Sequence, residues 1–288
     1  MYPASFEYHR AASVADALAL LEKYGDSAKV IAGGHSLLPV MKLCFATPAH
    51  LIDIARVAAL GGITESGGVV SVGALTTHRQ LGAFAAGRKG LAAIADAAAV
   101  IGDVQIRNRG TVGGSLAHAD PGADLPAVML VLAAEVVATG KAGERVIPVD
   151  SFFTDTFSTA LGSGELVTKV RLTVPASGTG TAYVKCPDAA SGYAIVGVAA
   201  AVTASGGKIT AARVAMTGLG PKAMRLSAVE KALTGQAAND ATATTAAALA
   251  ATGLDLYDDA RGSAAYKANL AAVYAGRAIG AALGRAVG

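Results

Sequence analysis

The pattern of apolar and polar positions at the start of the chain predicts a helix and two strands. In residues 13–23, SVADALALLEK, apolar side chains recur at helical spacing after Ser13, a residue type that commonly caps helix N-termini. The stretch KVIAGG at 29–34 predicts a short buried strand ending in a glycine-rich turn, and HLIDI at 50–54 predicts a second strand. We therefore expect a first structural unit that spans residues 1–56.

Turn residues and helical spacing alternate in the next part of the chain. Residues 61–77, GGITESGGVVSVGALTT, predict a β-hairpin, because two β-rich stretches flank the turn residues 66–68. Thr76 or Thr77 can then cap a helix, and an Ala-rich helix is expected at 89–101. This region is therefore expected to mix helices and strands.

Glycine and asparagine interrupt the periodicity between residues 102 and 114, and we expect this segment to be a loop of unusual glycine density. Asp124 and Pro126 favour a helix start, which predicts a helix at 124–134. Strands are expected at 135–139, 145–149 and 166–175. Together these elements predict a mixed α and β middle unit, residues 57–177.

Pro, Gly, Ser and Thr cluster at 175–181, PASGTGT, which predicts a boundary between units. Antiparallel strands are expected in YVKC, YAIVGVAAAVTAS and KITAARVAMTGLG, followed by three Ala-rich helices, one of them a surface helix within 236–252. The last unit is thus residues 178–288, and the fold class is α+β.

Composition and charge exclude several classes of protein. Of the 288 residues, 53% are hydrophobic, which permits a substantial core and excludes a disordered chain. No run approaches the roughly 18 uninterrupted apolar residues of a membrane span, and the N-terminus lacks a signal-peptide core, so we expect a soluble cytoplasmic protein without a transmembrane segment. A net charge of +3, with scattered Lys and Arg, argues against nucleic-acid binding.

The cysteine content excludes two further kinds of site. Cys44 and Cys186 are far apart and lie in no CxxC or Cys/His pattern, so neither a disulfide framework nor a metal site is indicated. Any iron–sulfur centre that works with this chain would therefore be held by another polypeptide.

Two glycine pairs carry the candidate chemistry. Ala32-Gly33-Gly34-His35-Ser36 follows a predicted strand, and Thr111-Val112-Gly113-Gly114-Ser115 lies in the middle unit. Glycine allows positive φ and close approach of backbone N–H groups to an anion, while Ser and Thr hydroxyls add donors, so a pyrophosphate would suit such loops. An isolated pair is most simply a tight turn, and two matching pairs favour the anion site.

The common nucleotide-binding motifs are absent. No GxGxxG opens a helix after a first strand, and no GxxxxGK[ST] occurs, which disfavours Rossmann and P-loop proteins. A dinucleotide would instead have to lie between two subdomains, each of which supplies one loop.

Three segments identify a family resemblance: VIAGGHSLLPVMK, IGDVQIRNRGTVGGSLAHADPGADLPA and GELVTKVRL. They resemble the FAD-binding (medium) subunits of the molybdenum hydroxylase or xanthine oxidase family, most closely its carbon monoxide dehydrogenase branch, and the resemblance covers essentially the whole chain. It implies a two-subdomain FAD-binding fold of the vanillyl-alcohol-oxidase (PCMH) type followed by a C-terminal domain of antiparallel strands and helices.

The resemblance also implies which residues contact FAD, which would be bound non-covalently between the first two units. Ser115 stands where many relatives have Asn, a longer donor. Without the resemblance, Asp124 is most simply a carboxylate favoured by the helix dipole, and Tyr193 an ordinary core residue. The implied FAD-contacting residues are Ala32, Gly33, Gly34, His35, Ser36, Leu37, Ile101, Thr111, Gly113, Gly114, Ser115, His118, Asp124, Val167, Lys185 and Tyr193.

No catalytic residue or metal ligand is assigned to this chain, and His35 and His118 are expected to form hydrogen bonds. The resemblance implies electron transfer from two [2Fe–2S] clusters in a small partner subunit, through FAD, to an external acceptor such as quinone. The substrate would react at a molybdenum cofactor in a large partner subunit, within a dimer of heterotrimers in the cytoplasm or at the inner face of the membrane.

Carbon monoxide is the substrate that the resemblance favours, and an aldehyde, xanthine or an N-heterocycle is the alternative. Two other hypotheses are a scaffold subunit without a redox cofactor, against which the intact glycines argue, and a free-standing flavin oxidase.

Overall fold

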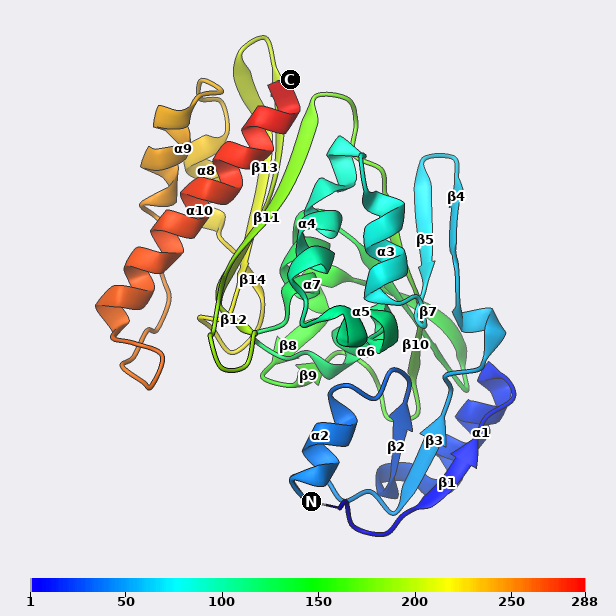
Figure 1. The fold of residues 1–288 in the computed structure, drawn as a ribbon. Helices are drawn as coiled ribbons and strands as arrows, with labels where there is room; N and C mark the ends of the chain where they lie inside the picture. Colours follow the sequence, from blue (N-terminus) through cyan, green and yellow to red (C-terminus); the bar gives the residue numbers. More distant parts are fainter. Residues whose placement is uncertain (1, 288) are drawn as a thin grey trace.

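The structure, a computed structural model, describes residues 2–287, and its N-terminal part is a small parallel sheet with the strand order β1-β3-β2 (Figure 1). Helix α1 packs against β3, and its N-cap Ser13 accepts a hydrogen bond from the N–H of Asp16, as the sequence predicted. The elements of this unit are β1 (Glu7–Arg10), α1 (Val14–Tyr24), η1 (Gly25–Ser27), β2 (Ala28–Ile31), α2 (Leu37–Lys42) and β3 (His50–Asp53), and η2 (Ala58–Leu60) connects it to the next unit.

The middle unit is a five-stranded antiparallel sheet, in the order β4-β5-β10-β6-β7, covered by helices (Figure 1). The predicted hairpin is present as β4 and β5, and Thr77 caps α3 in a capping box with Gln80. The elements are β4 (Ile63–Ser66), β5 (Val69–Gly73), α3 (His78–Ala85), η3 (Lys89–Leu91), α4 (Ala92–Val100), α5 (Val104–Arg109), α6 (Val112–His118), α7 (Asp124–Val131), β6 (Glu135–Gly140), β7 (Gly143–Pro148), η4 (Val149–Ser151), β8 (Phe153–Asp155), β9 (Ser158–Thr159) and β10 (Leu166–Thr173).

The glycine-dense segment 102–114 is not a loop, and here the prediction was wrong. It contains α5 and the start of α6, two short helices that begin at side-chain N-caps although the segment lacks helical periodicity. The Asp103 side chain accepts a hydrogen bond from the N–H of Ile106, and the Thr111 hydroxyl accepts one from the N–H of Gly114. Capping contributes about 0.5–2 kcal/mol per helix, which offsets the low helix propensity of glycine.

The C-terminal unit is a four-stranded antiparallel sheet, in the order β11-β12-β13-β14, between two helical layers (Figure 1). Helices α8 and α10 pack on one face and α4 and α7 of the middle unit on the other. Tyr183, Ala199 and Ala215 of this sheet therefore belong to the core of the middle unit. The elements are β11 (Thr179–Pro187), β12 (Ala194–Ser205), β13 (Lys208–Thr217), β14 (Met224–Arg225), α8 (Ser227–Leu233), α9 (Asp240–Ala247) and α10 (Ala264–Val287).

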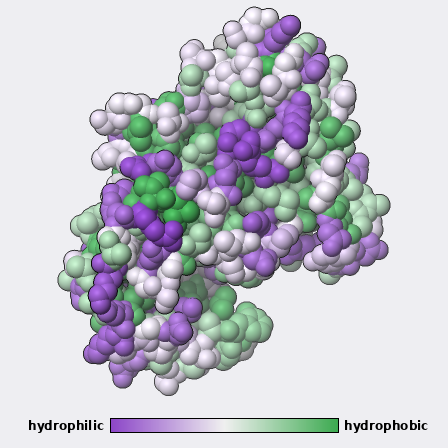
Figure 2. Space-filling model, turned by 180° about the vertical axis from the view of Figure 1, so that it is seen from behind, coloured by the Kyte–Doolittle hydropathy of each residue, from purple (hydrophilic) through white to green (hydrophobic). Residues whose placement is uncertain are grey.

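One helix among the described residues, α10, is long and apolar enough to cross a membrane by length and composition. In the structure it lies on β11 and β12 and buries Leu270, Ala275 and Ile279 against them. The face drawn in Figure 2 carries hydrophilic and hydrophobic residues in small mixed patches rather than in a continuous apolar belt. Packing within the C-terminal layer thus accounts for the apolar side of α10.

Candidate functional site

One large cavity is lined by all sixteen residues that the family resemblance assigned to FAD. They come from the β2–α2 loop, the end of α4, helix α6, the start of α7, β10, β11 and the β11–β12 connection. The cavity volume of about 1530 Å³ exceeds the roughly 300–1,000 Å³ usual for drug-sized ligands, so there is room for a large ligand. The assignment of each residue to the cofactor stays a prediction.

The first glycine loop follows β2 and has backbone donors available for a ligand. Among residues 2–287, nothing accepts a hydrogen bond from the backbone N–H groups of Gly33, Gly34, His35 or Ser36. Gly34 has a φ of +76°, a conformation that favours glycine. Unpaired N–H groups in succession form a concave anion site, so this loop has the chemistry expected for a diphosphate.

The second glycine loop offers hydroxyl groups rather than amides. The N–H of Gly113 donates to Ala74, the N–H of Gly114 donates to the Thr111 hydroxyl, and the N–H of Ser115 donates to the carbonyl of Thr111. The expectation that glycine amides of this loop would face an anion is therefore wrong. The hydroxyl hydrogen of Thr111 and the hydroxyl of Ser115, which no described residue engages, are the donors that remain beside the cavity.

The first loop packs against the segment that leads into the second loop, where Gly33 meets Arg109, 76 residues later in the sequence. A Cβ added to Gly33 would overlap the carbonyl oxygen of Arg109, and one added to Gly113 would lie 2.5 Å from the Cβ of Ala74. These two glycines thus serve close packing of the backbone. The contact brings the amides of the first loop and the hydroxyls of the second to one wall of the cavity.

A buried charged network lies at the wall formed by α7 and β11. Lys185 Nζ is 3.0 Å from Asp124 Oδ2 and 3.2 Å from the carbonyl oxygen of Val100, while the Tyr183 hydroxyl donates to Asp124 Oδ1 at 2.5 Å. Burial raises the pKa of Asp124, and the positive charge of Lys185 opposes this rise. Since both carboxylate oxygens are engaged, Asp124 positions Lys185, whose third N–H is free to face a ligand.

The remaining predicted residues line the cavity from several sides. Tyr193 is 39% exposed and packs against Gly122, and burial is the main cause of its raised pKa. Val167 is buried on β10, beside a β-bulge, and Ile101 ends α4. His35 Nδ1 lies 3.0 Å from the carbonyl oxygen of Gly33, which is the kind of hydrogen bond expected for this histidine. His118 Nε2 lies 3.9 Å from Oδ2 of Asp120.

His78 is a cavity residue that the sequence interpretation missed. It is 5% exposed, its ring abuts Gly110, and its Nδ1 has no hydrogen-bond partner among the described residues. Burial, with a smaller effect from His35, lowers the pKa of His78 to about 4, so the imidazole is neutral at pH 7. The sequence contains one indication of where His78 lies, namely that it directly follows the helix cap Thr77.

Nearly the whole chain is similar to known protein families and to individual proteins. Residues 4–176 match the family model "FAD binding domain in molybdopterin dehydrogenase", and residues 181–282 match "CO dehydrogenase flavoprotein C-terminal domain". The chain is 41% identical to the carbon monoxide dehydrogenase medium chain of Hydrogenophaga pseudoflava, over 99% of each chain. It is 39% identical to the alpha subunit of the 6-hydroxypseudooxynicotine dehydrogenase complex of Paenarthrobacter nicotinovorans, over 99% of this chain and 97% of that one.

Solved structures give the same result for the fold. A chain of the carbon monoxide dehydrogenase from Hydrogenophaga pseudoflava, in a form that lacks the Mo-pyranopterin moiety, superposes with a TM-score of 0.94 at 42% identity, over 99% of both chains. A chain of quinoline 2-oxidoreductase from Pseudomonas putida 86 superposes with a TM-score of 0.92 at 32% identity, over 100% of both chains.

Proposed function

The chain belongs to the family of FAD-binding subunits of molybdopterin dehydrogenases, and from this premise we propose that it carries electrons within a heteromeric molybdenum hydroxylase. Members of this family are oxidoreductase subunits that hold FAD, while molybdenum and iron–sulfur cofactors belong to partner subunits. The proposed direction runs from [2Fe–2S] clusters of a small partner to an external acceptor such as quinone.

The observation that carries the proposal is the convergence of three parts of the chain on one large cavity. The first part supplies unpaired amides at Gly33 to Ser36, and the second supplies the hydroxyls of Thr111 and Ser115. The third supplies Lys185, held by a buried carboxylate. Amides, hydroxyls and a cation are the donor set that a diphosphate and an electron-rich ring require, so the residues present fit FAD.

The protein's own part in the reaction is binding, orientation and electrostatics. The first loop would hold the diphosphate through its amides, and Thr111 and Ser115 would donate to the same group. Lys185 would place a fixed positive charge at the cavity wall, and Tyr193 would cover the opening. FAD, when bound, supplies one-electron and two-electron redox chemistry, so no side chain of this protein is needed as a general base.

We also propose that carbon monoxide is the substrate of the complex. This assignment is supported by the 41% identity to a carbon monoxide dehydrogenase medium chain and by the match of the C-terminal residues 181–282 to the corresponding family model. We further propose a large molybdenum subunit and a small iron–sulfur subunit as partners, a dimer of heterotrimers, and a cytoplasmic location. The three units proposed for the chain are residues 1–56, 57–177 and 178–288.

Reconstitution with FAD tests the cofactor assignment. The purified chain, incubated with FAD and desalted, should retain about one flavin per chain by its visible absorption. A chain that retains none under conditions where its circular dichroism is native would overturn the assignment.

Assembly with a large molybdenum subunit and a small iron–sulfur subunit of this family tests the substrate assignment. The complex should reduce an artificial acceptor with carbon monoxide and not with an aldehyde, xanthine or quinoline. Reduction by one of the organic substrates alone would assign the chain to another hydroxylase of the same family.

A further inference from the structure

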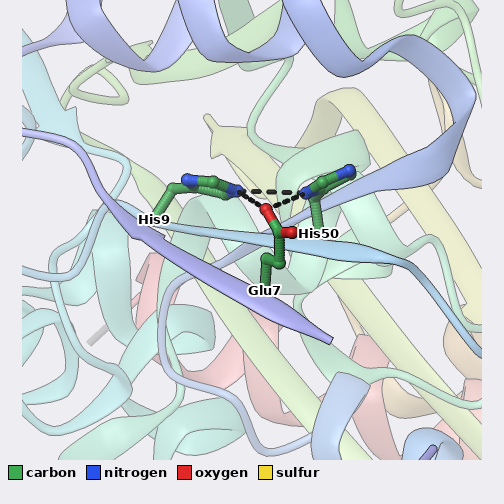
Figure 3. Close-up of side chains that lie close together, drawn as sticks. All are labelled: Glu7, His9 and His50. Atoms are coloured by element: carbon green, nitrogen blue, oxygen red, sulfur yellow. Dashed lines mark hydrogen bonds and ion pairs between the residues drawn. The ribbon is translucent and has the colours of Figure 1, made fainter. Parts of the chain in front are cut away.

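Two histidines and a glutamate meet on one face of the N-terminal sheet, outside the cavity described above (Figure 3). Glu7 and His9 alternate on β1, so both side chains point to the same face. His50 begins β3 and is paired with Glu7 in the parallel register of these two strands. The fold therefore brings together three groups whose chemistry suits a metal ion, from segments more than 40 residues apart.

The spacing of the three ligand atoms matches a transition-metal site. His9 Nε2 is 3.1 Å from His50 Nδ1, and Glu7 Oε2 is 3.5 Å from His50 Nδ1 and 3.8 Å from His9 Nε2. The point equidistant from these three atoms, the circumcentre of a triangle with those sides, lies about 2.0 Å from each. Zinc binds imidazole nitrogen at about 2.0–2.1 Å and carboxylate oxygen at about 2.0–2.2 Å.

Packing against Tyr24 holds the two imidazoles in place. The Tyr24 ring, at the end of α1, stacks on His50 with ring centroids 3.9 Å apart and on His9 with centroids 4.7 Å apart. The histidine side chains are 19% and 18% exposed, whereas that of Glu7 is 71% exposed. Two ordered nitrogens and one reachable carboxylate leave room for solvent ligands on the open side.

We propose that Glu7, His9 and His50 bind one divalent transition-metal ion of the zinc type, with water completing the coordination. Two imidazoles and a single carboxylate select zinc or a similar ion over magnesium or calcium, which prefer all-oxygen sites. The ion would cross-link β1 to β3, the central strand of the N-terminal sheet. The neighbouring strand on the other side of β3 is β2, which leads into the first glycine loop. The site is independent of the proposed redox function.

The competing arrangement is a metal-free hydrogen bond between His9 and His50, with the exposed Glu7 side chain nearby. Both arrangements need the same three residues, but they differ in metal content. Metal binding therefore decides between them, and flavin content or electron transfer does not enter the test.

The experiment is a zinc titration of the full chain after treatment with EDTA, followed by dialysis and elemental analysis. The wild type should bind one zinc per chain and melt at a higher temperature with zinc than without it, because a ligand that binds only the folded state stabilises it. His50→Gln should lose stoichiometric zinc. Glu7→Gln, which changes an exposed side chain, should fold normally and bind zinc at least about ten-fold more weakly.

His118→Gln is the matched control, because His118 has one nearby carboxylate, that of Asp120, and His118 is not part of the three-residue cluster. It should bind zinc like the wild type. A wild type that binds no zinc after dialysis overturns the proposal. Equal zinc retention by wild type and by Glu7→Gln and His50→Gln variants of native circular dichroism overturns it as well.

Discussion

His78 should make the stability of this protein depend on pH between about 6.5 and 4. The side chain is 5% exposed, and its Nδ1 has no partner among residues 2–287 that would compensate a positive charge. Burial is the larger cause of its lowered pKa, and the neighbouring His35 adds to it. Protonating His78 in the folded protein therefore places an unpaired charge inside the cavity wall.

The change in the free energy of unfolding with pH depends on two pKa values of His78, about 4 in the folded chain and 6.5 in the unfolded chain. Above pH 6.5 the imidazole is neutral in both states and contributes nothing to the pH dependence. Between pH 6.5 and 4 the unfolded chain binds a proton that the folded chain does not, so the free energy of unfolding falls as the pH falls. A pKa difference of about 2.5 corresponds to a loss of about 3 kcal/mol at pH 4.

The substitution His78→Gln removes this titration and keeps a polar side chain. Histidine proton resonances, followed by NMR from pH 8 to 4, should include one that is absent from His78→Gln and that titrates near pH 4. The chain has five histidines, so the difference spectrum identifies the signal. Urea unfolding at several pH values should then show the wild type losing about 3 kcal/mol more than the variant between pH 6.5 and 4.

Two results would refute the reasoning. A His78 resonance that titrates near pH 6.5 would mean that solvent reaches the ring. Parallel pH profiles of wild-type and His78→Gln stability would mean that other groups cause the whole pH dependence.

Three further substitutions test contacts between the units of the chain. Gly33→Ala should destabilise the chain by about 1–3 kcal/mol and lower its flavin content, because the new Cβ overlaps a carbonyl of the second loop's segment, whereas Gly280→Ala, with open space at the Cβ, should raise the melting temperature. Lys185→Met should cost about 3–5 kcal/mol in urea unfolding by leaving a buried carboxylate unpaired, and adding Asp124→Leu should restore part of the loss. Arg285→Met should cost about 1.5–3 kcal/mol, measured by thermal unfolding, because Arg285 makes two hydrogen bonds from α10 to a carboxylate on α4.

Most helices and strands could be predicted because their signals are local. The cap at Ser13, the hairpin around residues 66–68 and the long apolar strands β12 and β13, joined at Gly206-Gly207, each have a pattern that depends on neighbours in sequence. Strand β1, Glu7–Arg10, was missed since its four residues are polar or aromatic without alternation. It is a strand because β3 pairs with it, which is a tertiary cause.

The surface helix expected within 236–252 was right in type and too long. Helix α9 covers Asp240–Ala247, starting at the cap Asn239, and it buries Ala243, Ala246 and Ala247 against neighbouring elements. Alanine has a high helix propensity everywhere in this segment, so propensity alone could not set the ends or reveal a packed face. The cap and the burial set both.

The family resemblance identified residues that line the cavity, but it did not reveal their hydrogen-bond partners or charge states. Asp124 stays a predicted ligand contact, and the sequence contains no indication that its two oxygens accept hydrogen bonds from Tyr183 and Lys185. No local pattern indicates that a residue on α7 meets two residues on β11 about 60 positions later. His78 escaped notice for the same reason, since only its burial beside Gly110 gives it an unusual charge state.

The two glycine pairs look alike in sequence, but the structure gives each glycine a different constraint. Gly34 needs its positive φ, Gly33 and Gly113 need the absence of a Cβ because another backbone segment occupies that space, and Gly114 meets only the Thr111 hydroxyl. A ligand-binding rationale alone would treat all four as equivalent. Gly33 packs on Arg109 and Gly110, directly before the second loop, so this backbone contact helps to place the amides of one unit near the hydroxyls of another.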